Sequence, residues 1–201
     1  MTGFLLAIAI ITPAVGAGQE TTARDEVGSD EGTSPDAAAT AREAIVTTSM
    51  GSFAIRLLSN LAPRHVEHFV SIAEEGGYDG TTFHRVIPGG IIQGGDPLSR
   101  DPDKVALYGT GGLGVLDSEF SARPMARGAV AAVLLPNRPN SGGSQFFVVL
   151  FDQPALTGKY TIFGEVISGM EVADRIGQVP VEGDRPRQRI EITSVTVRSA
   201  E

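Results

Sequence analysis

The 201-residue chain contains no cysteine and few basic residues, with 16 lysines and arginines against 24 acidic residues. The absence of cysteine excludes disulfides, a thiolate nucleophile, zinc–thiolate sites and a lipidated N-terminal cysteine. No basic patch stands out, and the formal net charge is −8. These features argue against nucleic acid or an anionic lipid surface as the main partner.

The N-terminal apolar run is also short. Phe4–Ile11 has eight apolar residues, too few to cross a bilayer but enough for the core of a signal peptide. Val15 and Ala17 before Gly18 match a small-residue cleavage site. We therefore expect residues 1–17 to be a signal peptide, and the mature protein to be periplasmic or otherwise extracytoplasmic, without stable membrane insertion. No lysine or arginine precedes the run, so an uncleaved anchor or a wrongly chosen start codon is the alternative.

Residues 18–43 contain seven acidic and two basic residues, and almost no large apolar side chain. Such a segment cannot bury enough surface to offset the entropy lost on ordering. We expect a disordered acidic linker. The hydrophobic share of the whole chain is 41%, which is enough for one core, and we assign the folded domain to residues 44–201.

From residue 44 onward, short β-rich runs alternate with turns. The segment IVTTSMGSFAIRLL predicts a hairpin with its turn at Met50–Gly51. Further strand-like runs are TFHRVI, GIIQ, GAVAAVLL, SQFFVVL, TIFGEVI and the closing RIEITSVTVRS. About eight short strands with turn-rich connections favour one antiparallel barrel.

Two segments have helical periodicity. In the first, Pro63 is placed to start a helix and Gly76–Gly77 to end it, and the apolar face consists of Val66, Phe69, Val70 and Ala73. The second is SGMEVADRIGQ. Together with the strands, they predict a mainly β fold with helical caps.

Three motif matches do not support other functions. Gly109–Gly114 fits GxGxxG, but a proline-limited stretch follows where a dinucleotide site needs a helix, so we expect no cofactor. His65 and His68 could share a metal ion, but no third ligand is apparent nearby, and a surface pair is the favoured interpretation. Ser144 lacks the final glycine of a hydrolase nucleophile elbow.

The segment FHRVIPGGIIQGGDP, residues 83–97, resembles the signature of the cyclophilins, which are peptidyl-prolyl cis–trans isomerases. The similarity continues, in the family's order, through YGTGGLG, NSGGSQFF and LTGKYTIFGEV. It covers most of residues 44–198. The resemblance implies a closed eight-stranded antiparallel barrel capped by two α-helices, with a proline pocket on its outer wall. It also implies a monomer that acts on proline-containing polypeptides in protein folding.

The resemblance assigns roles to individual residues. Arg85 falls on the catalytic arginine, Gln93 on the pocket glutamine and Phe147 on the phenylalanine of the pocket floor. The other expected substrate-binding residues are Ile91, Leu156, Tyr160 and Val133. The alternative for Arg85 is a surface salt bridge. His84 is expected to be structural, because the reaction abstracts no proton.

The reaction needs few groups. An X–Pro bond isomerises over a barrier of roughly 20 kcal/mol without breaking a covalent bond. Its transition state is a twisted amide, in which the prolyl nitrogen regains a lone pair. A guanidinium can donate to that nitrogen and so favour the twisted form. An apolar pocket fixes the ring and weakens solvation of the planar amide.

Two positions depart from the family pattern. Gly90 replaces a phenylalanine that usually lines the proline pocket, and Ala155 stands where many members have tryptophan. We therefore expect reduced activity. We also expect weak cyclosporin binding, because alanine lacks the indole donor. The alternative function is a chaperone-like module that binds proline-containing segments with little or no turnover.

Overall fold

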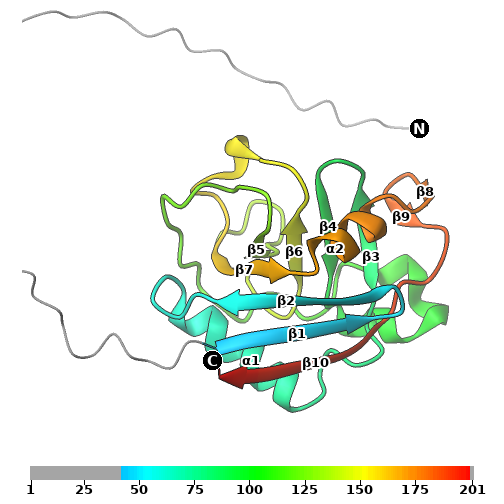
Figure 1. Ribbon diagram of the computed structural model, residues 1–201, viewed down its shortest axis with the longest axis horizontal. Helices are drawn as coiled ribbons and strands as arrows, with labels where there is room; N and C mark the ends of the chain where they lie inside the picture. The colour runs from blue at the N-terminus through cyan, green and yellow to red at the C-terminus, as the bar shows by residue number, and fades with distance from the viewer. Residues whose placement is uncertain (1–41, 200–201) are drawn as a thin grey trace, which may run out of the picture. The chain divides into compact units, whose positions relative to one another are not determined.

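The computed structural model describes residues 42–199 (Figure 1). The expected signal peptide, 1–17, lies outside the described residues, as does the expected linker except for Arg42 and Glu43. Both of these belong to the first strand. Within residues 42–199, no helix combines the length and apolarity needed to cross a membrane.

Eight strands form one antiparallel sheet in the order β10-β1-β2-β7-β5-β6-β4-β3, and β8 and β9 form a separate hairpin. The first strands are β1 (Arg42–Thr48), β2 (Gly51–Leu57), β3 (Phe83–Ile87), β4 (Ile91–Gly94) and β5 (Ala129–Ala132). The remaining ones are β6 (Phe146–Val149), β7 (Ile162–Ser168), β8 (Val181–Glu182), β9 (Arg185–Pro186) and β10 (Ile192–Ser199). Every run expected to be a strand overlaps one of these strands.

The hairpin of β1 and β2 shows why the turn lies where the sequence placed it. Thr48 Oγ1 accepts a hydrogen bond from the Met50 amide. Gly51 has a φ of +121°, a backbone conformation that residues other than glycine rarely adopt. On its other edge β1 pairs with β10, from Arg42 opposite Ser199 onward. The strand therefore begins two residues before the domain start assigned from the sequence.

The sheet is a half-barrel, and the expectation of a closed barrel was wrong. Within the described residues the edge strands β3 and β10 share no ladder and meet at an isolated bridge between Thr82 and Glu191. Between α2 and β10 the chain leaves the sheet to form the β8–β9 hairpin. Asp184 of that hairpin covers the edge of β3 instead, where its carbonyl accepts a hydrogen bond from the Val86 amide, 2.7 Å long.

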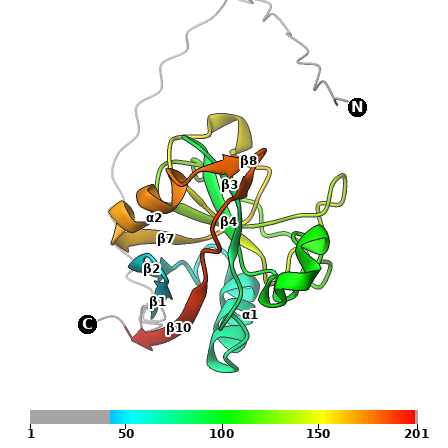
Figure 2. The same cartoon turned by 90° about the vertical axis from the view of Figure 1, so that its right-hand side faces the viewer.

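Two α-helices pack on the sheet, α1 (Pro63–Glu74) against β10 and β7, and α2 (Met170–Gly177) against β2 and β4 (Figure 2). Short 3-10 helices are η1 (Pro97–Arg100), η2 (Pro102–Leu107) and η3 (Pro154–Leu156). The predicted apolar face of α1 is buried, with His65 beside it. Gly76, at φ +67°, follows the end of the helix.

Side chains alternate between the two faces of the central strands. Ile92, Val130 and Val148 point into the main core, together with Phe146 and the buried face of α1. Their strand neighbours point the other way and, together with Met125 from an irregular segment, form a second apolar cluster on the outer wall: Ile91, Met125, Ala129, Ala131, Phe147, Val149 and Ile162. This cluster, called the outer cluster below, positions the candidate site.

Candidate active site

Arg85 and Gln93 face each other because the register of β3 and β4 pairs them directly. Arg85 Nη1 donates a hydrogen bond of 3.2 Å to Gln93 Oε1, and Arg85 Nε donates one of 2.7 Å to Asp184 Oδ2. Two acceptors on different elements therefore fix the guanidinium plane. The Arg85 side chain is still 40% exposed, so part of the guanidinium can reach a ligand.

A chain of amides continues from Gln93 into the protein. Gln93 Nε2 donates to Gln145 Oε1 over 3.0 Å, and Gln145 Nε2 donates to the Gly111 carbonyl over 2.7 Å. Both glutamine side chains are buried. An arginine side chain only donates hydrogen bonds, so Gln93 must turn its oxygen toward Arg85. This orientation leaves the Gln93 amide nitrogen to donate to Gln145, and it likewise sets the orientation of the Gln145 amide. The chain therefore preorganises the acceptor beside Arg85.

The apolar part of the site is built on the outer cluster. Phe147 is 3% exposed and lies beside Gln93 in the ladder between β4 and β6. The Tyr160 ring meets the Phe147 ring edge-on, with centroids 5.3 Å apart. Leu156, Tyr160 and Val133 pack on the cluster as half-buried side chains. Ile91, also a member, is 9% exposed.

Two open cavities adjoin this floor. A cavity of about 410 Å³ is lined by Arg85, Gln93, Val133 and Asp184 among others, and we call it the arginine cavity. A cavity of about 720 Å³ is lined by Leu156 and Tyr160 together with residues 134–139. The two cavities share the walls formed by residues 134–136. Five of the seven residues expected from the sequence line these two cavities, and the other two, Ile91 and Phe147, belong to the outer cluster.

Sequence reasoning missed three residues of the site. Asp184 is 99 positions from Arg85, and no local pattern connects them. Gln145 is fully buried and orients Gln93. Met125 is 1% exposed and fills the outer cluster, although it comes from a segment without regular structure. A fully buried glutamine needs a partner, so Gln145 could have been found only after its burial was known.

The structure shows what surrounds the two histidines His65 and His84 and the glycine loop that the sequence analysis singled out. His84 is 8% exposed, and burial lowers the pKa of its imidazole. His65 Nδ1 lies 2.6 Å from Glu119 Oε2. Residues 42–199 contain no group of three histidine, aspartate or glutamate side chains that could hold a metal. The Gly109–Gly114 loop follows η2, and two of its amides donate to the buried carboxylate of Asp96.

The chain resembles known proteins along most of its length. The family model described as cyclophilin type peptidyl-prolyl cis-trans isomerase/CLD matches residues 44–197. A peptidyl-prolyl cis-trans isomerase-like 1 of Neurospora crassa is 38% identical over 158 residues, covering 78% of this chain and 94% of that protein. A probable peptidyl-prolyl cis-trans isomerase of Brucella suis is 44% identical over 131 residues, covering 63% of this chain and 66% of that protein.

The fold has solved counterparts. A crystal structure of a Cryptosporidium parvum cyclophilin type peptidyl-prolyl cis-trans isomerase, obtained in the presence of the dipeptide Ala-Pro, superposes with a TM-score of 0.71 at 29% identity. The match covers 79% of this chain and 99% of that one. The half-barrel and its two helices therefore follow an arrangement already seen in a solved structure.

Proposed function

The chain belongs to the cyclophilin family and is a peptidyl-prolyl cis–trans isomerase, and we propose that Arg85 is its catalytic residue. The observation that carries this assignment is the position of the guanidinium. It is held by Asp184 and Gln93, is partly exposed, and lies at the margin of the outer cluster. A strong donor beside an apolar floor matches the two requirements of a twisted prolyl amide.

In the proposed mechanism the proline ring rests on Phe147, with Ile91, Leu156 and Tyr160 around it. Contact with apolar side chains removes water from the amide and so disfavours its planar, charge-separated form. As the bond twists, an N–H of Arg85 donates to the prolyl nitrogen, and Gln93 holds Arg85 in place. No proton is transferred and no bond is broken, so no cofactor or metal takes part.

The assignment is tested by the catalysed isomerisation rate of an Ala-Pro peptide with the full-length chain. Arg85 is supported if the rate enhancement depends on the guanidinium while binding of the peptide does not vanish. A rate enhancement independent of Arg85 would contradict the assignment but would leave membership of the family untouched. A chain that binds the peptide without turning it over would favour the binding-module alternative.

Cyclosporin is expected to bind the unmodified chain weakly. Ala155 lies on η3 with its methyl group exposed, and it supplies neither a ring nor an N–H. Ala155→Trp should bind at least about tenfold more tightly, because one hydrogen bond and a ring contact together exceed about 1.4 kcal/mol. Titration calorimetry on both proteins measures the difference. Equal and tight binding by the two would show that another contact supplies the affinity.

We also propose that the mature chain begins near Gly18 and is located outside the cytoplasm. The support is the apolar run followed by small residues before Gly18. Intact-mass analysis of the protein recovered from its own host should give a chain shortened by about 17 residues. A chain that starts at Met1 or Thr2 in the cytosolic fraction would refute this location.

A further inference from the structure

Besides the cavity lined by Leu156 and Tyr160, a further cavity adjoins the arginine cavity, and we call it the second cavity. It has a volume of about 420 Å³ and lies between η2, the start of β3 and the segment 182–190. The two cavities have four lining residues in common: His84, Val105, Tyr108 and Arg185. The two cavities are therefore neighbours separated only by residues that line both, and a polypeptide held at Arg85 has the second cavity beside it.

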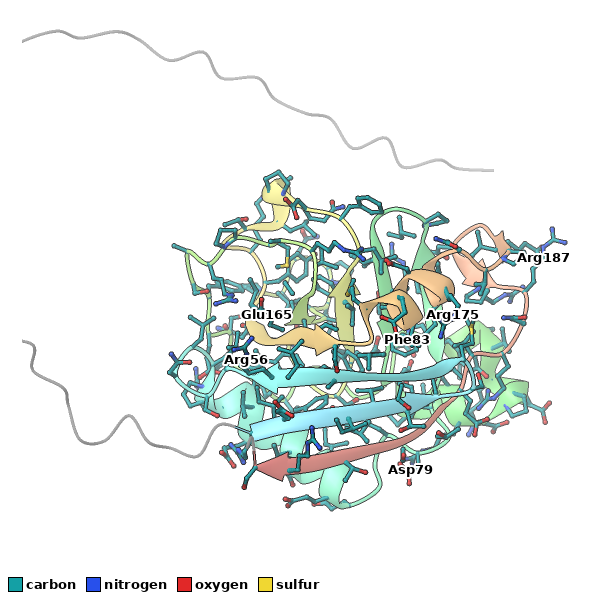
Figure 3. All side chains as sticks on the ribbon, in the orientation of Figure 1. Arg56, Asp79, Phe83, Glu165, Arg175 and Arg187 are labelled. Atoms are coloured by element: carbon teal, nitrogen blue, oxygen red, sulfur yellow. The ribbon has the colours of Figure 1, made fainter. Side chains whose placement is uncertain are left out.

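The walls of this second cavity are rich in guanidinium groups. Arg185, Arg187 and Arg189 all line it, and Glu182 is the one carboxylate in its wall. All residues from 185 to 190 line the cavity, so the three arginines gather here because this segment follows its wall. In Figure 3, Arg187 lies at the outer margin of the molecule beside the β8–β9 hairpin.

The three arginines differ in how far they are neutralised. Arg189 donates to the carbonyls of Ser99 and Gly80 and contacts Glu191 at 3.3 Å, so its guanidinium is already occupied by contacts within the protein. Arg185 has a distant ion pair of 3.9 Å with Glu182. Among residues 42–199, no carboxylate lies within 4.0 Å of the Arg187 guanidinium. Positive charge is thus left over at this cavity, although the whole chain carries −8.

A buried histidine lies in the wall shared by the two cavities. His84 lines both cavities and is 8% exposed, and neither of its ring nitrogens has a hydrogen-bond partner among the described residues. Both nitrogens are shielded from solvent, so the imidazole forms part of the wall and does not contact a ligand directly. The Tyr108 ring packs edge-on against His84 at 6.3 Å and also lines both cavities.

We propose that this second cavity is a subsite for an acidic side chain, glutamate or aspartate, of the polypeptide whose X–Pro bond is held at Arg85. Arg185 and Arg187 supply the positive charge. The inference rests on the isomerase function stated above and narrows its substrates to proline-containing segments with acidic residues nearby.

Whether acidic residues in a peptide raise or lower its turnover distinguishes this subsite from the effect of the overall charge. A chain with net charge −8 repels an acidic peptide on average, so a uniform field predicts slower turnover of acidic peptides. A local subsite predicts the opposite. Since Arg185 and Arg187 are exposed, the preference should be modest and should weaken as salt is added.

The experiment compares peptides with an Ala-Pro core that carry three glutamates, or three glutamines, either before or after the core. Exchange NMR measures kcat/KM with the full-length chain and needs no coupling protease. In one of the two series, with the residues either before or after the core, we expect kcat/KM for the glutamate peptide to exceed that for the glutamine peptide by about fivefold at low salt. Turnover of the glutamine peptides reports the isomerase function separately, so its absence would point to a failure of that function.

Two variants locate the effect. Arg187→Gln should reduce the ratio between glutamate and glutamine peptides toward one. The matched control is Arg56→Gln, which makes the same charge change on β2, on the opposite side of the view in Figure 3 and outside all three cavities. The control should keep the ratio. Equal turnover of the glutamate and glutamine peptides by the unmodified chain, or equal loss in both variants, overturns the proposal.

Discussion

Replacing Arg85 with alanine is expected to lower kcat/KM for an Ala-Pro peptide by at least about tenfold. The guanidinium is the charged donor of the arginine cavity that lies beside Gln93 and the outer cluster. A hydrogen bond from a charged group is worth about 1.5–3 kcal/mol, and about 1.4 kcal/mol corresponds to a factor of ten. Because the bond is made to a nitrogen that becomes basic only when the amide twists, the loss should appear in kcat.

Companion variants separate the role of Arg85 in the reaction from its role in the fold. Arg85→Lys keeps the charge but loses the forked geometry that lets one guanidinium contact both Asp184 and Gln93. It should recover only part of the activity. Asp184→Asn removes the charge that orients the guanidinium and should lower kcat less than Arg85→Ala does.

Thermal unfolding of each variant is the control, because Gln93 is buried and loses a donor in Arg85→Ala. A variant that unfolds at the same temperature but isomerises slowly supports the catalytic assignment. If Arg85→Ala folds normally and retains the full rate, Arg85 is a surface ion-pair residue, which is the alternative that the sequence left open.

Gly90→Phe is expected to raise kcat/KM by up to about tenfold. A ring at this position would bury apolar surface against the proline, an effect of about 1.5–3 kcal/mol for a whole side chain and less when partly exposed. The structure removes one obstacle that the sequence could not judge. Gly89 has a φ of +68°, but Gly90 is not among the glycines with positive φ, so a side chain at 90 does not strain the backbone.

The remaining obstacle to Gly90→Phe is crowding by Ile87. A Cβ on residue 90 would lie 3.0 Å from Ile87 Cγ2, so Ile87 must move by a few tenths of an ångström. Ile87 is 38% exposed, which leaves it room to do so. Gly90→Ala is the matched control, because it adds the same Cβ and the same backbone restriction without the ring.

The two substitutions at position 90 are compared with the unmodified chain on one peptide. A gain in Gly90→Phe that is absent in Gly90→Ala assigns the effect to the ring. Equal rates in all three proteins, with normal folding, would mean that another side chain already lines this part of the pocket. Tight peptide binding with negligible turnover by the unmodified chain would instead favour the chaperone-like alternative.

The sequence by itself determined the local elements and the direction of their side chains. Pro63, the apolar face of α1 and Gly76 specify where that helix begins and ends, because each acts within a turn or two of the chain. The period of two along β4 likewise sends Ile92 to the main core and Ile91 and Gln93 to the outer wall.

Only the tertiary structure decided which distant segments meet. The strands that form the floor are joined by loops of very different length, and the positions at which such loops bring strands together depend on the packing of the whole domain. Asp184 therefore reaches Arg85 across 99 positions without a signal in either segment. The β8–β9 excursion leaves a half-barrel where eight strands could have closed, and it also forms a wall of the second cavity.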